Sequence, residues 1–128
     1  MHKTTDSLFS ALWNDYVSIT PSALRIHKLL AGEENSPQIV NDHVAFRTFA
    51  LVKTRLSHLA EHFLALGYEA KGDYDFKAKK VTAQHFEHPD PTVPKVFISE
   101  LRVNEFSAET QRIIHALVEQ MPASVVEA

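Results

Sequence analysis

Residues Asn41 to Phe49 read N-D-H-V-A-F-R-T-F, and the rest of the fold can be worked out from this stretch. It is rich in β-branched and aromatic residues and too short for a typical helix, so we interpret it as a strand. Because alternate residues of a strand share a face, His43 and Arg47 are expected to point the same way. Val44 and Phe46 point the other way and suit packing against a helix.

The segments after this strand show helical and extended patterns in turn. Apolar residues recur at helical spacing from Thr54 to Leu66, and Gly67 ends that pattern. Three further extended stretches follow, at Tyr68 to Tyr74, Lys80 to Glu87 and Lys95 to Val103. Residues 41–101 therefore predict a β-α-β-β-β module, in which a curved mixed sheet carries the helix on one face.

Helical patterns flank this module on both sides. Asp6 or Ser7 can cap a first helix, Thr20 followed by Pro21 begins a second, and Ser107 caps a last one. We therefore expect an α+β fold in which two helices precede the module and one follows it. The expected organisation is a single domain, divided into a helical segment 1–38, the module 39–103 and a C-terminal helix 104–128.

The composition excludes several classes of protein. The chain has 128 residues, of which 45% are apolar and 23% charged, with a net charge of −3, three glycines and no cysteine. The lack of cysteine excludes disulfides, zinc ribbons and iron–sulfur clusters, and the charge argues against nucleic-acid binding. No apolar run is long enough to span a bilayer, and the start has no secretory signal. We therefore expect a cytoplasmic protein with neither nucleic acid nor membrane as partner.

Chemistry is first indicated by His43 and Arg47, on one face of the same strand. An imidazole can bind a metal, and a guanidinium can grip a carboxylate with two hydrogen bonds. Together they suit a small anionic substrate held against a metal ion. The alternative is purely structural, with His43 paired to Asp42 and Arg47 in an ordinary salt bridge.

Glu100 and His85 are further candidate ligands. Glu100 lies late in an otherwise apolar strand, where its charge needs a partner or a metal. That partner is either Arg47 or a divalent ion also held by His43. Two histidines and one carboxylate facing a cavity would suit a non-haem iron(II) site with open positions for substrate and dioxygen.

Three segments together resemble a known family. They are N-D-H-V-A-F-R-T-F at 41–49, A-K-K-V-T-A-Q-H-F-E-H-P-D-P at 78–91, and P-K-V-F-I-S-E-L-R-V at 94–103. They are similar to the 2-oxoadipate dioxygenase/decarboxylase family, also called hydroxyglutarate synthases. The resemblance implies a vicinal-oxygen-chelate, glyoxalase-like architecture. It also implies iron(II)-dependent conversion of 2-oxoadipate to 2-hydroxyglutarate with loss of carbon dioxide, in lysine degradation.

The resemblance also implies roles for individual residues. His43 matches the family's first-strand metal ligand, and Arg47 matches the arginine that binds the substrate carboxylate. The family's remaining ligands, a histidine and a glutamate, come from a second module, whereas Glu100 holds the corresponding fourth-strand position of the first. We therefore expect the chain to be the N-terminal half of a longer protein, or to pair with a second module or another chain. The remaining alternative is that the site has been lost.

The expected function is that of a non-haem, metal-dependent oxidoreductase. We expect a dioxygenase/decarboxylase acting on a small 2-oxo dicarboxylic acid and dioxygen, with iron(II) or another divalent metal as cofactor. Two alternatives stay open because a fold does not determine a function. One is a glyoxalase-like metal-dependent isomerase or lyase, and the other is a non-catalytic module for small-ligand binding or dimerisation.

Overall fold

The computed structural model describes residues 3–31 and 42–122. The chain divides into two compact units, Met1–Asn41 and Asp42–Ala128, and each is described by itself. The boundary expected between residues 38 and 39 lies outside the described residues. No helix within the described ranges is long and apolar enough to cross a membrane.

The first unit is a pair of helices, as the sequence predicts. Helix α1 spans Thr5–Ile19 and α2 spans Pro21–Ala31, so proline opens the second helix as expected. The cap of α1 is Thr4, whose side chain accepts a hydrogen bond from the backbone N–H of Ser7 at 3.1 Å. Asp6 and Ser7, the two expected caps, lie inside the first turn. There the negative charge of Asp6 interacts favourably with the positive end of the helix dipole.

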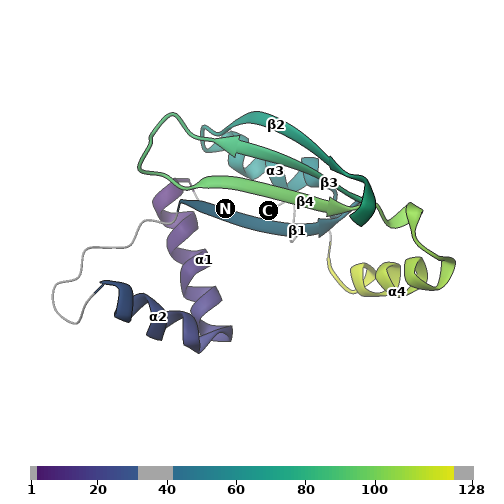
Figure 1. The fold of residues 1–128 in the computed structure, drawn as a ribbon, viewed down its shortest axis with the longest axis horizontal. Helices are drawn as coiled ribbons and strands as arrows, with labels where there is room; N and C mark the ends of the chain where they lie inside the picture. The colour runs from purple at the N-terminus through teal and green to yellow at the C-terminus, as the bar shows by residue number, and fades with distance from the viewer. Residues whose placement is uncertain (1–2, 32–41, 123–128) are drawn as a thin grey trace. The chain divides into compact units, whose positions relative to one another are not determined.

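The second unit contains a four-stranded mixed sheet in the order β1-β4-β3-β2 (Figure 1). Its strands are β1 at His43–Phe49, β2 at Glu69–Phe76, β3 at Val81–Glu87 and β4 at Lys95–Leu101. β1 runs parallel to β4, and the other neighbours are antiparallel. This arrangement confirms the α+β class and the β-α-β-β-β order predicted from the sequence.

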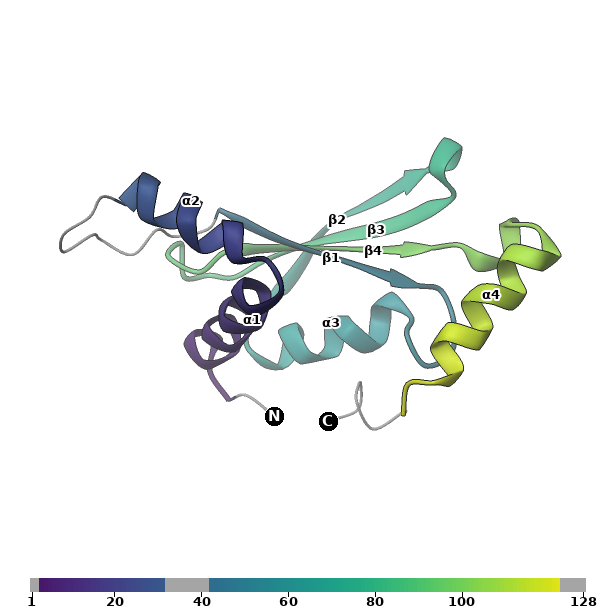
Figure 2. The same ribbon diagram turned by 90° about the horizontal axis from the view of Figure 1, so that it is seen from below.

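Helix α3, at Leu56–Ala65, connects β1 to β2 and lies against one face of the sheet (Figure 2). Its buried residues include Ala60 and Phe63, which face a sheet core containing Phe86 and Ile98. These sheet residues are at most 1% exposed, so their apolar surface contributes strongly to the stability of the module.

Gly67 turns the chain out of α3 into β2, as the helical pattern predicts. Its φ is 102°, a left-handed conformation that glycine adopts without strain. A Cβ atom at this position would lie 2.9 Å from Nε2 of His88, whose ring nitrogen already contacts the Leu66 carbonyl oxygen at 3.0 Å. The turn therefore requires glycine for both its backbone angle and its space.

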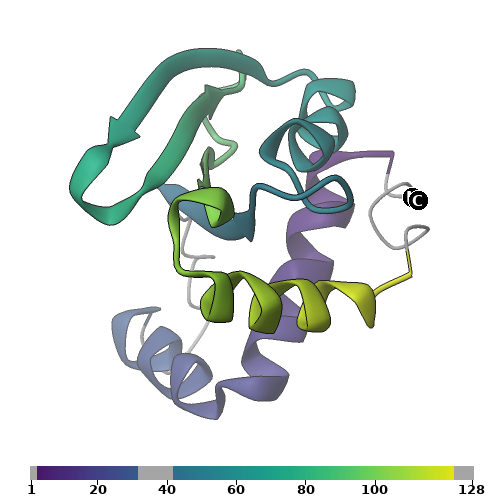
Figure 3. The same cartoon turned by 90° about the vertical axis from the view of Figure 1, so that its right-hand side faces the viewer.

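Helix α4, at Ala108–Glu119, lies beyond the carboxyl ends of β1 and β4 (Figures 1 and 3). Ser107 caps it as expected, because its hydroxyl accepts a hydrogen bond from a backbone N–H at 3.2 Å. Ile114 and Val118 pack against Val103, which belongs to the short 3₁₀ helix after β4. This small cluster holds α4 at the end of the sheet.

Candidate functional site

The first strand places His43 and Arg47 on the sheet face opposite α3. Along β1, exposed residues alternate with partly or fully buried ones, and His43, Ala45 and Arg47 are the exposed members. The intervening Phe46 packs its ring 5.5 Å from that of Phe63 on α3. The alternation therefore runs as the sequence predicts, and we call the face with His43 and Arg47 the open face.

Arg47 is held by its neighbour on β4. Its Nε donates a hydrogen bond of 2.8 Å to Oγ of Ser99, which lies directly opposite in the parallel pair. Ser99 is 5% exposed, so this support is nearly buried. Among the described residues no carboxylate pairs with Arg47, and the two terminal nitrogens of its guanidinium stay available for a planar anion such as a carboxylate.

His43 contacts Asp42 through Nδ1 of its ring. The His43 side chain is 48% exposed and that of Asp42 is 82% exposed. The contact expected under the purely structural interpretation is therefore present, but it uses one ring nitrogen and leaves Nε2 available. A single free imidazole nitrogen is what a metal ligand needs.

His85 lies beside His43 on the open face. Their ring centroids are 6.0 Å apart and the ring planes differ by 31°. Nε2 of His85 is buried and has no hydrogen-bond partner among the residues that the structure describes. Buried polar atoms in native proteins are nearly always paired, so this nitrogen points to a partner outside the described residues.

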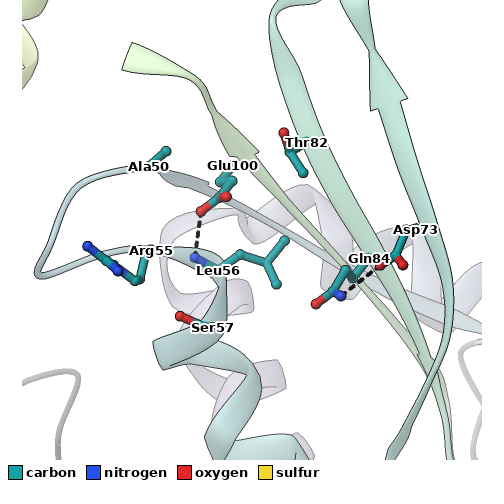
Figure 4. Close-up of a pocket in the computed structure, with 8 residues that line it drawn as sticks. All are labelled: Ala50, Arg55, Leu56, Ser57, Asp73, Thr82, Gln84 and Glu100. Carbon is teal, nitrogen blue, oxygen red and sulfur yellow. Dashed lines mark hydrogen bonds between the residues drawn. The ribbon is translucent and has the colours of Figure 1, made fainter. Parts of the chain in front are cut away.

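Glu100 does not join this group, contrary to the expectation that it and His43 hold one ion. It pairs in register with Thr48 on β1 and Thr82 on β3, a row that faces α3. One of its carboxylate oxygens accepts a 2.7 Å hydrogen bond from the backbone N–H of Leu56 (Figure 4). Glu100 therefore supplies the hydrogen-bond acceptor for a backbone N–H in the first turn of α3, because the N-cap residue Arg55 makes no side-chain cap.

A hollow of about 460 Å³ opens beside Glu100 on the α3 side of the sheet (Figure 4). Asp73 and Gln84 at its wall hydrogen-bond each other at 2.7 Å. The carboxylates of Asp73 and Glu100 are thus engaged within the chain, and the sheet separates this wall from His43 and Arg47. We therefore place the candidate site on the open face and not in this hollow.

The described residues supply only part of a metal site. No group of three or more His, Asp or Glu side chains lies close enough together in the described ranges to hold an ion. Two adjacent imidazoles, one with a free nitrogen and one with an unpaired buried nitrogen, fit a divalent transition metal by donor type. Further ligands would have to come from elsewhere.

Sequence reasoning missed Ser99 as the residue that holds Arg47. A serine among the apolar residues V-F-I-S-E-L of β4 was the available signal. Its partner depends on the register between two strands that lie 52 positions apart in the chain. Residue patterns determine the face of each strand but not this register.

The chain is similar to proteins of known or assigned activity. Residues 8–125 match the family model described as 2-oxoadipate dioxygenase/decarboxylase. Two relatives carry that name: a chloroplastic protein of Arabidopsis thaliana, 32% identical over 118 residues, and a chloroplastic/amyloplastic protein of Oryza sativa, 33% identical over 130 residues. The matches cover 84% and 91% of this chain, but only 32% and 35% of those proteins, so the chain spans about a third of their length.

Solved structures agree with this similarity. A Shewanella frigidimarina protein described as a hydrolase is 53% identical with a TM-score of 0.92, and the match covers all of this chain and 49% of that one. Hydroxyglutarate synthase from Oryza sativa, solved in complex with 2-oxoadipate, is 31% identical with a TM-score of 0.72, over 93% of this chain and 42% of that one.

A more distant neighbour bears on the fold alone. It is a glyoxalase superfamily protein from Ralstonia eutropha, 19% identical with a TM-score of 0.62, matched over 86% of this chain and 37% of that one. This likeness confirms the glyoxalase-like architecture expected from the sequence.

Proposed function

Because the chain belongs to the 2-oxoadipate dioxygenase/decarboxylase family, we propose that it forms part of an iron(II)-dependent enzyme acting on a small 2-oxo dicarboxylic acid. The proposed reaction converts 2-oxoadipate and dioxygen into 2-hydroxyglutarate and carbon dioxide, a step in lysine degradation. The carboxyl carbon next to the 2-oxo group leaves as carbon dioxide with its own two oxygen atoms. Both atoms of dioxygen enter the product, one in the new carboxylate at the former 2-oxo carbon and one in the hydroxyl group, so atoms and electrons balance without another reductant.

The observation that carries this proposal is the arrangement of His43 and Arg47 on one open sheet face. Arg47 is pre-positioned by Ser99 through Nε, so its two terminal nitrogens can grip one carboxylate of the substrate without being reoriented first. Because Arg47 lies four residues along β1 from His43, a bound diacid would have its other end directed toward the imidazole. Arg47 is thus the proposed substrate anchor.

His43 is the proposed metal ligand, through Nε2. Bound iron(II) would supply coordination positions for the 2-oxo acid and the redox chemistry that dioxygen requires. His85 is proposed to contribute to the same site, because its buried, unpaired Nε2 lies beside the His43 ring. Glu100 is left out of the ligand set, since its carboxylate is engaged by the backbone of α3.

We further propose that a second module or another chain covers the open face and completes the ligand set. The chain spans less than half of the solved structures it matches. In addition, Tyr74 and Phe76 on β2 are 42% and 43% exposed, and their rings stack with centroids 6.3 Å apart. Exposed aromatic surface of this kind is typical of a face that another polypeptide covers.

Oxygen consumption tests the proposed reaction. The protein is loaded anaerobically with iron(II), mixed with 2-oxoadipate and exposed to dioxygen, while oxygen uptake and carbon dioxide release are recorded. We expect both in a 1:1 ratio, with 2-hydroxyglutarate as the product. Conversion of a 2-oxo acid without oxygen uptake would support the isomerase alternative, and tight binding without turnover would support the binding module.

A further inference from the structure

The two ring nitrogens of His43 have different surroundings. Nδ1 contacts the carboxylate of Asp42, whereas no described residue forms a hydrogen bond with Nε2. A carboxylate only accepts hydrogen bonds, so its partner nitrogen must carry the proton. In the neutral ring the lone pair is then on Nε2, which is the nitrogen left open for a metal.

The main chain of Asp42 is hydrogen-bonded to β4, although its side chain is exposed. The backbone N–H of Lys95 donates a 2.9 Å hydrogen bond to the carbonyl oxygen of Asp42. This bond joins the residue just before β1 to the first residue of β4, so the base of the Asp42 side chain is attached to the sheet. On its other flank the His43 ring lies beside His85, at a centroid distance of 6.0 Å.

From this geometry we infer that Asp42 is a positioning residue for metal binding. It holds the imidazole of His43 in the tautomer with hydrogen on Nδ1 and directs Nε2 to the ion. The inference rests on the proposed role of His43 as metal ligand. Carboxylates that orient a ligating histidine in this way raise its basicity and fix its ring, and their loss typically lowers metal affinity about 10- to 100-fold.

The first test reads the tautomer in the metal-free protein. The ¹⁵N chemical shifts of the neutral His43 ring distinguish hydrogen on Nδ1 from hydrogen on Nε2. We expect the Nδ1–H form in the unchanged protein and a mixture of both forms in Asp42→Ala. Asp73→Asn is the matched control, because Asp73 is also an exposed, hydrogen-bonded aspartate but lies on the α3 side of the sheet.

The second test measures affinity for Mn²⁺, a redox-stable divalent ion, by calorimetric titration. We expect Asp42→Ala to weaken binding about 10- to 100-fold, with Asp42→Asn in between because its amide oxygen still accepts a hydrogen bond. Circular dichroism should show every variant folded, since the Asp42 side chain is 82% exposed.

The controls separate this inference from the proposed function. If His43→Ala abolishes Mn²⁺ binding while Asp42→Ala keeps the wild-type affinity and tautomer, the role of Asp42 is refuted and the metal role of His43 stands. If His43→Ala keeps full affinity, both the metal role and the positioning role are refuted. Loss of affinity in both variants, with a changed tautomer in Asp42→Ala, supports both.

Discussion

The two faces of the four-stranded sheet differ in how their side chains are satisfied. On the face covered by α3, Phe86 and Ile98 are at most 1% exposed, and the carboxylate of Glu100 accepts a hydrogen bond from the α3 backbone. On the open face, Arg47 has no carboxylate partner and His85 keeps a buried nitrogen unpaired among the described residues. The side chains on the α3 face thus find their partners within the chain, whereas Arg47 and His85 on the open face leave hydrogen-bonding groups without a partner among the described residues.

This difference separates residues that stabilise the module from residues available for chemistry. A group whose hydrogen bonds are made within the chain contributes to folding. A buried unpaired group such as Nε2 of His85 raises the free energy of the folded chain, whereas an exposed group such as Arg47 is hydrated and free to bind a ligand. Substitutions on the two faces should therefore change different measured quantities.

The largest expected effect is on stability, from Phe86→Ala on the α3 face. Removing a fully buried aromatic ring should lower the free energy of unfolding by about 3–5 kcal/mol, measured by urea denaturation. Tyr74→Ala, which removes a ring 42% exposed on the open face, is the control and should cost much less. Equal losses would contradict the assignment of the core to the α3 face.

Arg47→Ala should have the largest effect on turnover. Loss of a charged two-point grip on the substrate carboxylate is expected to lower kcat/KM about 100-fold, chiefly by raising KM. The free energy of unfolding should change little. Arg55→Ala, at the wall of the hollow on the α3 side, is the matched control and should leave both kcat and KM unchanged. An unchanged KM in Arg47→Ala would refute the substrate-anchor role.

His85→Leu should lower turnover about tenfold through loss of a positioned polar group, without destabilising the metal-free protein. Leucine removes the unpaired buried nitrogen, whose desolvation costs about 1–3 kcal/mol, so the free energy of unfolding should stay equal or rise. Steady-state kinetics and thermal unfolding are the measurements. A destabilised variant with full activity would show that His85 is only structural.

Glu100→Ala should affect stability and not metal binding. It removes the acceptor for the Leu56 N–H, and loss of such a cap costs about 1–2 kcal/mol. Mn²⁺ affinity should stay within about twofold of the unchanged protein, because Glu100 lies on the face away from His43. A loss of tenfold or more would restore Glu100 to the ligand set.

The smallest expected effect is the pH dependence of Tyr68→Phe. Burial raises the pKa of Tyr68 to about 12, and its hydroxyl donates a 2.6 Å hydrogen bond to the Pro94 carbonyl oxygen. Because the folded pKa exceeds the unfolded value of about 10, this stabilisation is complete below pH 10 and is lost as pH rises toward 12.

The free energy of unfolding of Tyr68→Phe should therefore be about 0.5–1.5 kcal/mol lower at pH 7. It should also decline less steeply with pH between pH 10 and 12 than that of the unchanged protein. Chemical denaturation across that range measures both quantities. Tyr74→Phe, at an exposed tyrosine, should follow the unchanged protein. Parallel curves for Tyr68→Phe and the unchanged protein would contradict the link to the buried phenol.

Residue patterns predicted most of the fold because they report burial directly. The alternation along 41–49 placed His43 and Arg47 together, and glycine at position 67 ended the helical pattern of α3 correctly. The pattern of α4 was less informative, since Ile113 and Leu117 belong to its apolar stripe yet are 62% and 57% exposed. The small cluster around Val103 covers Ile114 and Val118 but does not extend over the rest of the apolar stripe of α4.

The site was predicted less completely because it depends on strand register and on distant partners. The sequence shows Glu100 late in an otherwise apolar strand, but only its pairing with Thr48 and Thr82 shows that it lies on the face toward α3. The start of α3 likewise depends on Glu100, 44 positions away from Leu56, and not on a local cap. Such long-range hydrogen bonds leave no periodic signal in the sequence.

The parallel pairing of β1 with β4 also determines when Arg47 acquires its support during synthesis. Arg47 and Ser99 are separated by 52 positions, and ribosomes add about 5–20 residues per second, so the serine emerges roughly 3–10 s after the arginine. Throughout that interval the first strand has no β4 neighbour. If Arg47 anchors an anion as proposed, its Ser99 support exists only after β4 has docked against β1, so anion binding would report the formation of this strand pair.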